Sequence, residues 1–123
     1  MRSISIEEIS RLSLIGYRNQ SCHTLTTSLF DKFPEGPDFV FRSDDNGTIQ
    51  GCVGAGLAHA LVALLTVDVD DPATVVVPIE PAPPPRRIHI VWLGDRKPGS
   101  SQQAFVDVVA EVCADLGRTD QAA

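Results

Sequence analysis

Apolar residues recur at intervals of three and four in four segments of the chain, which predicts four helices. The first covers about residues 6–12 and begins with a capping box formed by Ser5 and Glu8. The second follows Ser21, which we expect to be its N-cap. The apolar faces of the three later helices are formed by Cys22, Leu25, Leu29 and Phe33, by Ile49, Cys52 and Val53, and by Phe105, Val108, Val109, Val112 and Leu116.

Between these helices lie five apolar runs that are typical of strands, at residues 14–17, 39–41, 57–65, 75–79 and 88–93. The run at 57–65 does not alternate, which is typical of a strand covered on both faces, although a helix is an alternative at this length. Strands that alternate with helices favour an α/β fold. We expect a three-layer, mostly parallel mixed sheet of about five strands, with helices on both faces.

Length, charge and cysteine content are those of one acidic domain. The chain has 123 residues, a net charge of −6 and a sequence pI of about 4.8, so its surface repels phosphate backbones. Its longest strongly apolar stretch, residues 58–67, is too short to cross a membrane as a helix, and no signal peptide follows Met1. The three cysteines are well separated and include no CxxC pair. We therefore expect a cytoplasmic location and no membrane partner.

An ordered series of segments fills the second half of the chain. A glycine-stopped helix leads into an apolar run, then come a second apolar run, a proline-rich connector, an alternating run and a helix that begins with serine. These segments are residues 54–62, 75–79, 81–85, 87–92 and 100–105, the last including Ala104 and Phe105. The series resembles the effector-binding domain of LysR-type transcriptional regulators, and the likeness covers about residues 6–116.

The resemblance implies that the chain is the second half of that domain, one lobe of a type 2 periplasmic-binding-protein-like fold. In this family a small effector, often a carboxylate metabolite, binds between two lobes and changes how an attached helix-turn-helix domain engages DNA. The implied division is a lobe at residues 1–99 and a C-terminal helix at residues 100–123, which in relatives packs on the first lobe. The first lobe and the helix-turn-helix domain lie outside these residues, so DNA is contacted only through that other domain. No catalysis, cofactor or metal ion is implied.

One candidate effector site is the loop Asn19-Gln20-Ser21-Cys22, where a predicted helix begins. Free backbone N–H groups and the positive end of a helix suit a carboxylate. Matching positions in the family line the effector pocket. The alternative is that Ser21 is only an N-cap.

A second candidate lies at the carboxyl end of the strand at residues 39–41, where Ser43 and Asn46 can offer polar contacts. Asp44 or Asp45 would repel an anion and is better explained as a helix cap. His59, within the apolar run, is a third candidate for an effector contact, although an ordinary core histidine is the simpler interpretation.

Other residue combinations are weaker. Cys22 beside His23 is an alternative site for thiol catalysis, but neighbouring helical side chains diverge by about 100°. The three histidines and three cysteines show no metal-ligand spacing. Asp68, Asp70 and Asp71 begin like a calcium loop, but the glycine and glutamate that such a loop needs are missing, so we expect a turn.

The leading hypothesis is an effector-sensing lobe of a LysR-type regulator, which binds half of a small effector and helps to form the regulator's dimer. The alternative is a truncated, stand-alone interaction module that forms homo-oligomers or pairs with full-length regulators through its lobe faces and the apolar stripe of its last helix. A small thiol enzyme is the third hypothesis.

Overall fold

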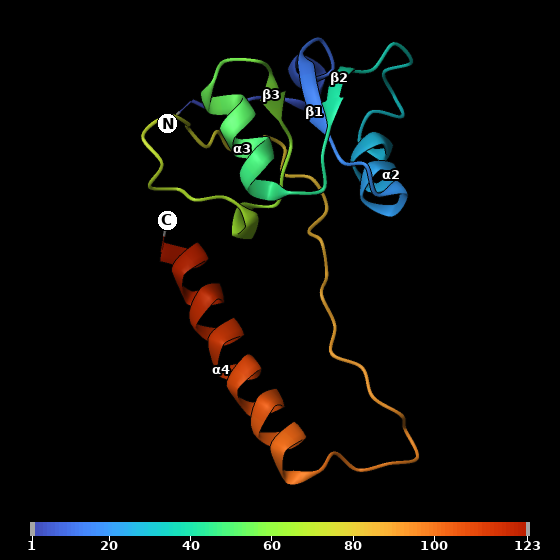
Figure 1. Cartoon of the computed structure of the whole chain (residues 1–123), viewed down its shortest axis with the longest axis vertical. Helices are drawn as coiled ribbons and strands as arrows, with labels where there is room; N and C mark the ends of the chain where they lie inside the picture. Colours follow the sequence, from blue (N-terminus) through green and yellow to red (C-terminus); the bar gives the residue numbers. More distant parts are fainter. Residues whose placement is uncertain (1, 123) are drawn as a thin grey trace. The chain divides into compact units, whose positions relative to one another are not determined.

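The computed structural model describes the backbone of residues 2–122 and the side chains of residues 2–117. It divides into two compact units, Met1–Arg86 and Arg87–Ala123. Figure 1 shows the sheet and α1 to α3 in the first unit and α4 in the second. The predicted division at residues 99 and 100 came from the family resemblance and stays a prediction.

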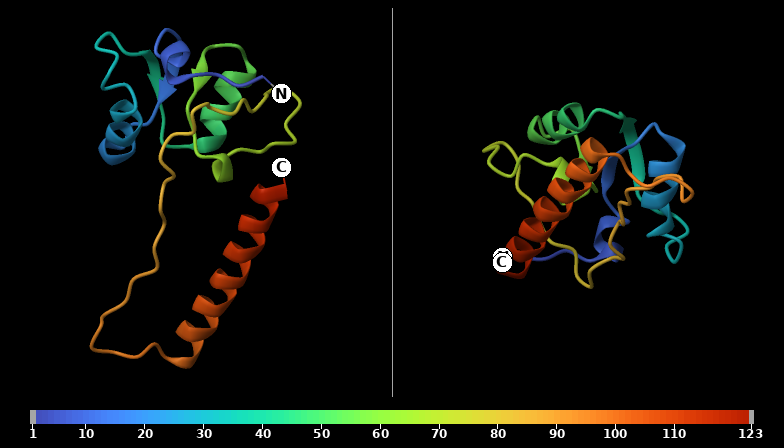
Figure 2. Two further views of the ribbon diagram at one scale, coloured as in Figure 1. Left: turned by 180° about the vertical axis from the view of Figure 1, so that it is seen from behind. Right: turned by 90° about the horizontal axis from the view of Figure 1, so that it is seen from below.

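A parallel sheet organises the first unit. Its three strands lie in the order β2-β1-β3. The chain therefore runs from the central strand β1 to β2 at one edge of the sheet, and then crosses β1 to reach β3 at the opposite edge. Because crossovers between parallel strands are right-handed, this reversal places the two connecting helices on opposite sides of the sheet. Figures 1 and 2 show α2 and α3 on opposite sides of β1. The elements of this layout are β1 (Ser13–Gly16), α2 (Gln20–Ser28), β2 (Asp38–Arg42), α3 (Asn46–Gly54) and β3 (His59–Ala60).

The α/β class and the parallel sheet are confirmed, but the described residues form three strands rather than about five. In the run at 57–65 only His59 and Ala60 are paired, with Leu14 and Ile15 of β1. A single turn of 3₁₀ helix follows at Leu64–Thr66.

The two remaining predicted strands are also absent. In the run at 75–79 only Ile79 is bridged, to Ile4, through hydrogen bonds at Pro78 O and Glu80 N, both of 3.0 Å. Residues 88–93 have no strand partner among the described residues. Alternation in sequence indicates a preference for extended structure, but a strand also needs a neighbour to hydrogen-bond.

Side-chain hydrogen bonds cap the first turns of α1 and α2. Helix α1 (Ile6–Ile9) has the predicted capping box: Glu8 N donates to Ser5 Oγ at 3.2 Å and Ser5 N donates to Glu8 Oε2 at 2.9 Å. The prediction that Ser21 caps α2 is wrong. Asn19 is the cap, and its Oδ1 accepts hydrogen bonds from the backbone of Ser21 at 3.0 Å and Cys22 at 3.3 Å. Asparagine is as good an N-cap as serine, and the helix begins two residues earlier.

The core lies on β1 and the elements around it. Leu14 is 1% exposed and Ile49, on α3, is 2% exposed. Leu14 packs in one cluster with Ile9 and Phe30. The expected apolar face of α2 is only partly correct, since Leu25 is 60% exposed.

Helix α3 holds the following loop through one side chain. Gln50 Nε2 donates to Asp68 O at 2.8 Å and to Thr74 Oγ1 at 2.9 Å, while Gln50 Oε1 accepts from Asp68 N at 3.0 Å. Asp71 N donates to Asp68 O, so the aspartates at residues 68–71 lie in the turn that was predicted.

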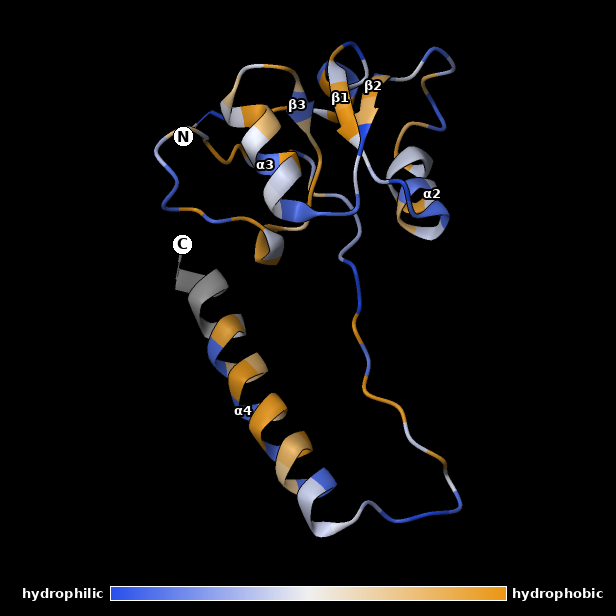
Figure 3. Cartoon of the chain, viewed as in Figure 1, coloured by the Kyte–Doolittle hydropathy of each residue, from blue (hydrophilic) through white to orange (hydrophobic). Residues whose placement is uncertain are grey.

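The second unit consists of an irregular segment, residues 87–99, and helix α4 (Ser100–Ala122). Gln102 Oε1 accepts a hydrogen bond from Gly99 N at 2.8 Å at the start of α4. Figure 3 shows apolar residues along α4. Over the residues described, no helix has both the length and the apolar character to span a membrane.

We expect Leu14→Ala to lower the free energy of unfolding by about 2 to 5 kcal/mol, because it leaves a cavity beside Ile9 and Phe30. Leu25→Ala removes the same atoms from an exposed position and should change stability by less than about 0.5 kcal/mol. Urea unfolding followed by circular dichroism measures both. Equal losses in the two variants would contradict this core.

Candidate functional site

Two loops meet at the carboxyl ends of β1 and β2. These neighbouring strands run parallel, so the loops that leave them lie at the same edge of the sheet. Asn19 N donates a 2.7 Å hydrogen bond to Asp44 Oδ1 and joins the two loops directly. Ser43 N donates to Gly16 O at 3.0 Å and extends the strand pairing to this point.

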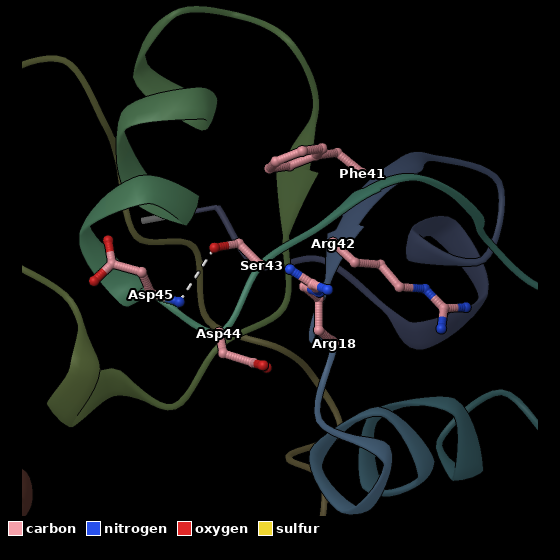
Figure 4. A pocket seen from close by; sticks show the side chains of 6 residues that line it. All are labelled: Arg18, Phe41, Arg42, Ser43, Asp44 and Asp45. Carbon is pink, nitrogen blue, oxygen red and sulfur yellow. Dashed lines mark hydrogen bonds between the residues drawn. The ribbon is translucent and has the colours of Figure 1, made fainter.

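An open pocket of about 600 Å³ lies where the loops meet. Figure 4 shows its side chains, which come from the end of β2 and from both loops. Its lining residues are Arg18, Phe41, Arg42, Ser43, Asp44 and Asp45.

The two arginines and the two aspartates of the pocket are engaged differently. Asp44 accepts the bond from Asn19, and Asp45 Oδ2 accepts from Thr48 N and Thr48 Oγ1, both at 2.7 Å. Neither Arg18 nor Arg42 forms an ion pair with another residue that the structure describes. The cations therefore keep their hydrogen-bond donors for a ligand, whereas the carboxylates bind backbone and hydroxyl groups.

Asp45 is the N-cap of α3. The hydrogen bonds from the Thr48 side chain and backbone hold the pKa of Asp45 below its usual value of 3.8. Figure 4 also shows Ser43 Oγ accepting from Asp45 N, at 3.2 Å. The interpretation of Asp45 as a cap is confirmed, and Ser43 fixes the backbone before it.

Of the predicted site residues, the structure places Ser43 in the pocket lining and Asn19 beside it. The others lie outside the lining: Gln20, Ser21 and Cys22 in the first turn of α2, Asn46 as the first residue of α3, and His59 on β3. Whether any of the predicted residues contacts an effector stays a prediction.

Sequence reasoning missed Arg18, Phe41 and Arg42. The signal was present, since Arg42 ends one strand and Arg18 comes two residues after another. The rule that led to Ser43, that strand ends supply site residues, applies equally to both arginines.

An aromatic contact supports one side of the pocket. The rings of His23 and Phe39 meet edge to face, with centroids 5.0 Å apart, and the guanidinium carbon of Arg42 lies 5.8 Å from the Phe39 centroid. We call these three side chains the His23–Phe39–Arg42 stack. Gly16 makes room for it, because a Cβ atom there would lie 2.7 Å from Phe39 Cδ1.

The surroundings of His23 disfavour the charged form of its ring. Burial lowers the pKa of His23, and the charge of Arg42 lowers it further. Its Nδ1 atom is buried and has no hydrogen-bond partner among the described residues. Cys22 and His23 thus show no hydrogen bond through that nitrogen, and the described part of the chain gathers no group of three potential metal ligands.

Comparison with known proteins identifies one family. A family model for the LysR substrate binding domain matches residues 2–114. No curated protein and no solved structure matches the chain.

We expect Asp45→Ala to destabilise the protein at pH 7, because Thr48 loses both hydrogen bonds. Since the folded pKa of Asp45 is depressed, its contribution is complete above pH 3.8 and is lost as the pH falls through the folded value. Asp45→Ser keeps a capping oxygen without a charge. Thermal unfolding from pH 7 to pH 2 should show less acid loss for Asp45→Ser than for the parent chain, and parallel curves would contradict this role.

Proposed function

The chain belongs to the LysR substrate-binding domain family, and we propose that it is an effector-sensing lobe that binds a small anionic metabolite at the pocket of Arg18 and Arg42. In this proposal the lobe forms one wall of an inter-lobe cleft, and a second lobe closes over the open side of the pocket. DNA is engaged only by a helix-turn-helix domain outside these residues.

The observation that carries the proposal is the pair of guanidinium groups without an ion-pair partner among the described residues. Guanidinium groups match carboxylate geometry and form charge-assisted hydrogen bonds. The two pocket carboxylates are already hydrogen-bonded by Asn19 and Thr48, which reduces their repulsion of an anion. Carboxylates are therefore the favoured class of effector.

The output of such a lobe is a shift of conformational population rather than chemistry. A ligand that binds closed lobes more tightly than open ones raises the ratio of closed to open protein, at most by the ratio of its two affinities. We propose no catalytic step, no cofactor and a cytoplasmic location. Ser43 and Asn19 contribute polar contacts at the pocket edge. Effector contacts elsewhere in the inter-lobe cleft are proposed for Gln20, Ser21 and Cys22, which follow Asn19, and for Asn46 and His59.

We expect Arg18→Gln combined with Arg42→Gln to weaken binding of an anionic effector by about 10- to 100-fold, because charge-assisted hydrogen bonds are lost. Isothermal calorimetry is run with sulfate and a panel of mono- and dicarboxylates. The anion that binds best is then titrated into both proteins.

Arg2→Gln combined with Arg11→Gln makes the same change of charge outside the pocket lining. This control should bind as the parent chain does, apart from a small effect of net charge. Equal weakening in both double variants would indicate long-range electrostatics and would contradict the site.

The alternative function, an interaction module, is favoured by α4. Its apolar stripe comprises Phe105, Val108, Val109, Val112 and Leu116. Phe105, Val108, Val112 and Leu116 are 62%, 58%, 50% and 42% exposed. An exposed apolar stripe of this length is typical of a surface that associates with another protein. In this second proposal the stripe forms a homo-oligomer or pairs with a full-length regulator.

We expect Val108→Glu combined with Val112→Glu to raise the dissociation constant of such an oligomer at least about tenfold. Ala110→Glu combined with Ala114→Glu places the same charges on the opposite side of α4 and should leave association intact. Light scattering after size exclusion measures the mass of each protein. A parent chain that stays monomeric at high concentration and captures no regulator would contradict the interaction module.

A further inference from the structure

The His23–Phe39–Arg42 stack links a half-buried histidine to a pocket cation through one phenyl ring. The His23 ring contacts Phe39 from α2, and Arg42 covers the same ring from the end of β2. Gly16, on the neighbouring strand, leaves the space that Phe39 fills. Arg42 also lines the pocket, so a change of charge in the pocket occurs close to the histidine.

Protonation of His23 is opposed in two ways. A proton on Nδ1 would be buried without an acceptor among the described residues, and the charged ring would face the positive charge of Arg42. The first effect depends on packing and persists when a ligand arrives. The second weakens when an anion binds to Arg42.

The charged groups of the pocket come from the elements around it. Arg42 is at the end of β2, Arg18 is in the loop before α2, and Asp44 is in the loop after β2. Asp44 is bonded to Asn19 N, and Asp45 is bonded to Thr48. Arg42 is the charge whose field acts on the imidazole.

We propose that anion binding at Arg42 is coupled to protonation of His23, and that Phe39 is the positioning residue that holds the two side chains together. The inference rests on the proposed function, because it uses the same pocket. It adds that the sensing lobe responds to pH together with its effector.

The sign of the effect follows from linkage. A bound anion cancels part of the Arg42 field and so raises the pKa of His23. Between the pKa of the free protein and that of the anion-bound protein, anion binding is accompanied by proton uptake. Anion affinity therefore rises as the pH falls through the pKa of His23. Two charges about 10 Å apart in a solvent-exposed setting shift a pKa by about 0.3 to 0.6 units. That shift corresponds to an increase in affinity of about two- to fourfold.

The test is an NMR titration of the histidine ring signals of the full chain between pH 4.5 and pH 8. Sulfate is the probe because it keeps its charge over this range, and sodium chloride at equal ionic strength is the reference for screening. His59 and His89 are internal controls in the same spectra. The backbone amide of Ser43 reports whether sulfate occupies the pocket.

We expect sulfate to raise the pKa of His23 by about 0.3 to 0.6 units beyond the effect of sodium chloride at equal ionic strength. Arg42→Gln should raise the pKa of His23 without sulfate and abolish the further rise. His23→Gln should flatten the pH dependence of sulfate affinity, whereas His89→Gln should not.

Two results would overturn the inference. If sulfate shifts the Ser43 amide while the pKa of His23 stays constant, the coupling is absent and the proposed anion site is unaffected. If sulfate shifts neither signal, the pocket does not bind the anion, and both the coupling and the proposed site fail. A His23 pKa unchanged by Arg42→Gln would overturn the coupling on its own.

Discussion

The pairing of β1 with strands on both its edges is the interaction on which the rest of the first unit depends. β1 is central in the order β2-β1-β3, and Leu14 carries the core toward Ile9 and Phe30. Parallel pairing with β2 brings the carboxyl ends of the two strands to one edge. The same pairing that buries the core therefore also brings Arg18 and Arg42 to one pocket, and stability and site formation have a common origin.

The charge balance of the pocket depends on hydrogen bonding more than on residue counts. Two arginines and two aspartates line it, and their formal charges cancel. The carboxylates are bonded to Asn19 and Thr48, within loops and caps that the fold needs in any case. The guanidinium groups form no ion pair with another described residue, and Arg42 contacts the Phe39 ring. The pocket is therefore neutral in formal charge, and among the described residues its carboxylates are hydrogen-bonded while its guanidinium groups have no ion-pair partner.

The sequence predicted local features better than long-range ones. The capping box at Ser5, the cap at Asp45 and the burial of Ile49 on the apolar face of α3 depend on residues within one turn of each other, and all three are confirmed. Only two residues of the run at 57–65 pair with β1, and such pairing depends on a neighbouring strand that the run itself does not encode. Arg18 and Arg42 were missed for a similar reason. They are 24 residues apart in the sequence, and only the strand pairing shows that they share a pocket.

The exposed apolar residues of the second unit follow from the same distinction. Residues 88–93 alternate as a strand does, yet Ile88, Val91 and Trp92 are 75%, 85% and 59% exposed. A β-prone segment without a partner leaves its backbone groups to water, and an apolar helical stripe without a partner leaves its side chains there. Both segments have the spacing of apolar residues that buried strands and helices have, and such elements are stabilised when their apolar face is buried. The local sequence of the second unit is therefore suited to contacts that its own residues, as described, do not supply.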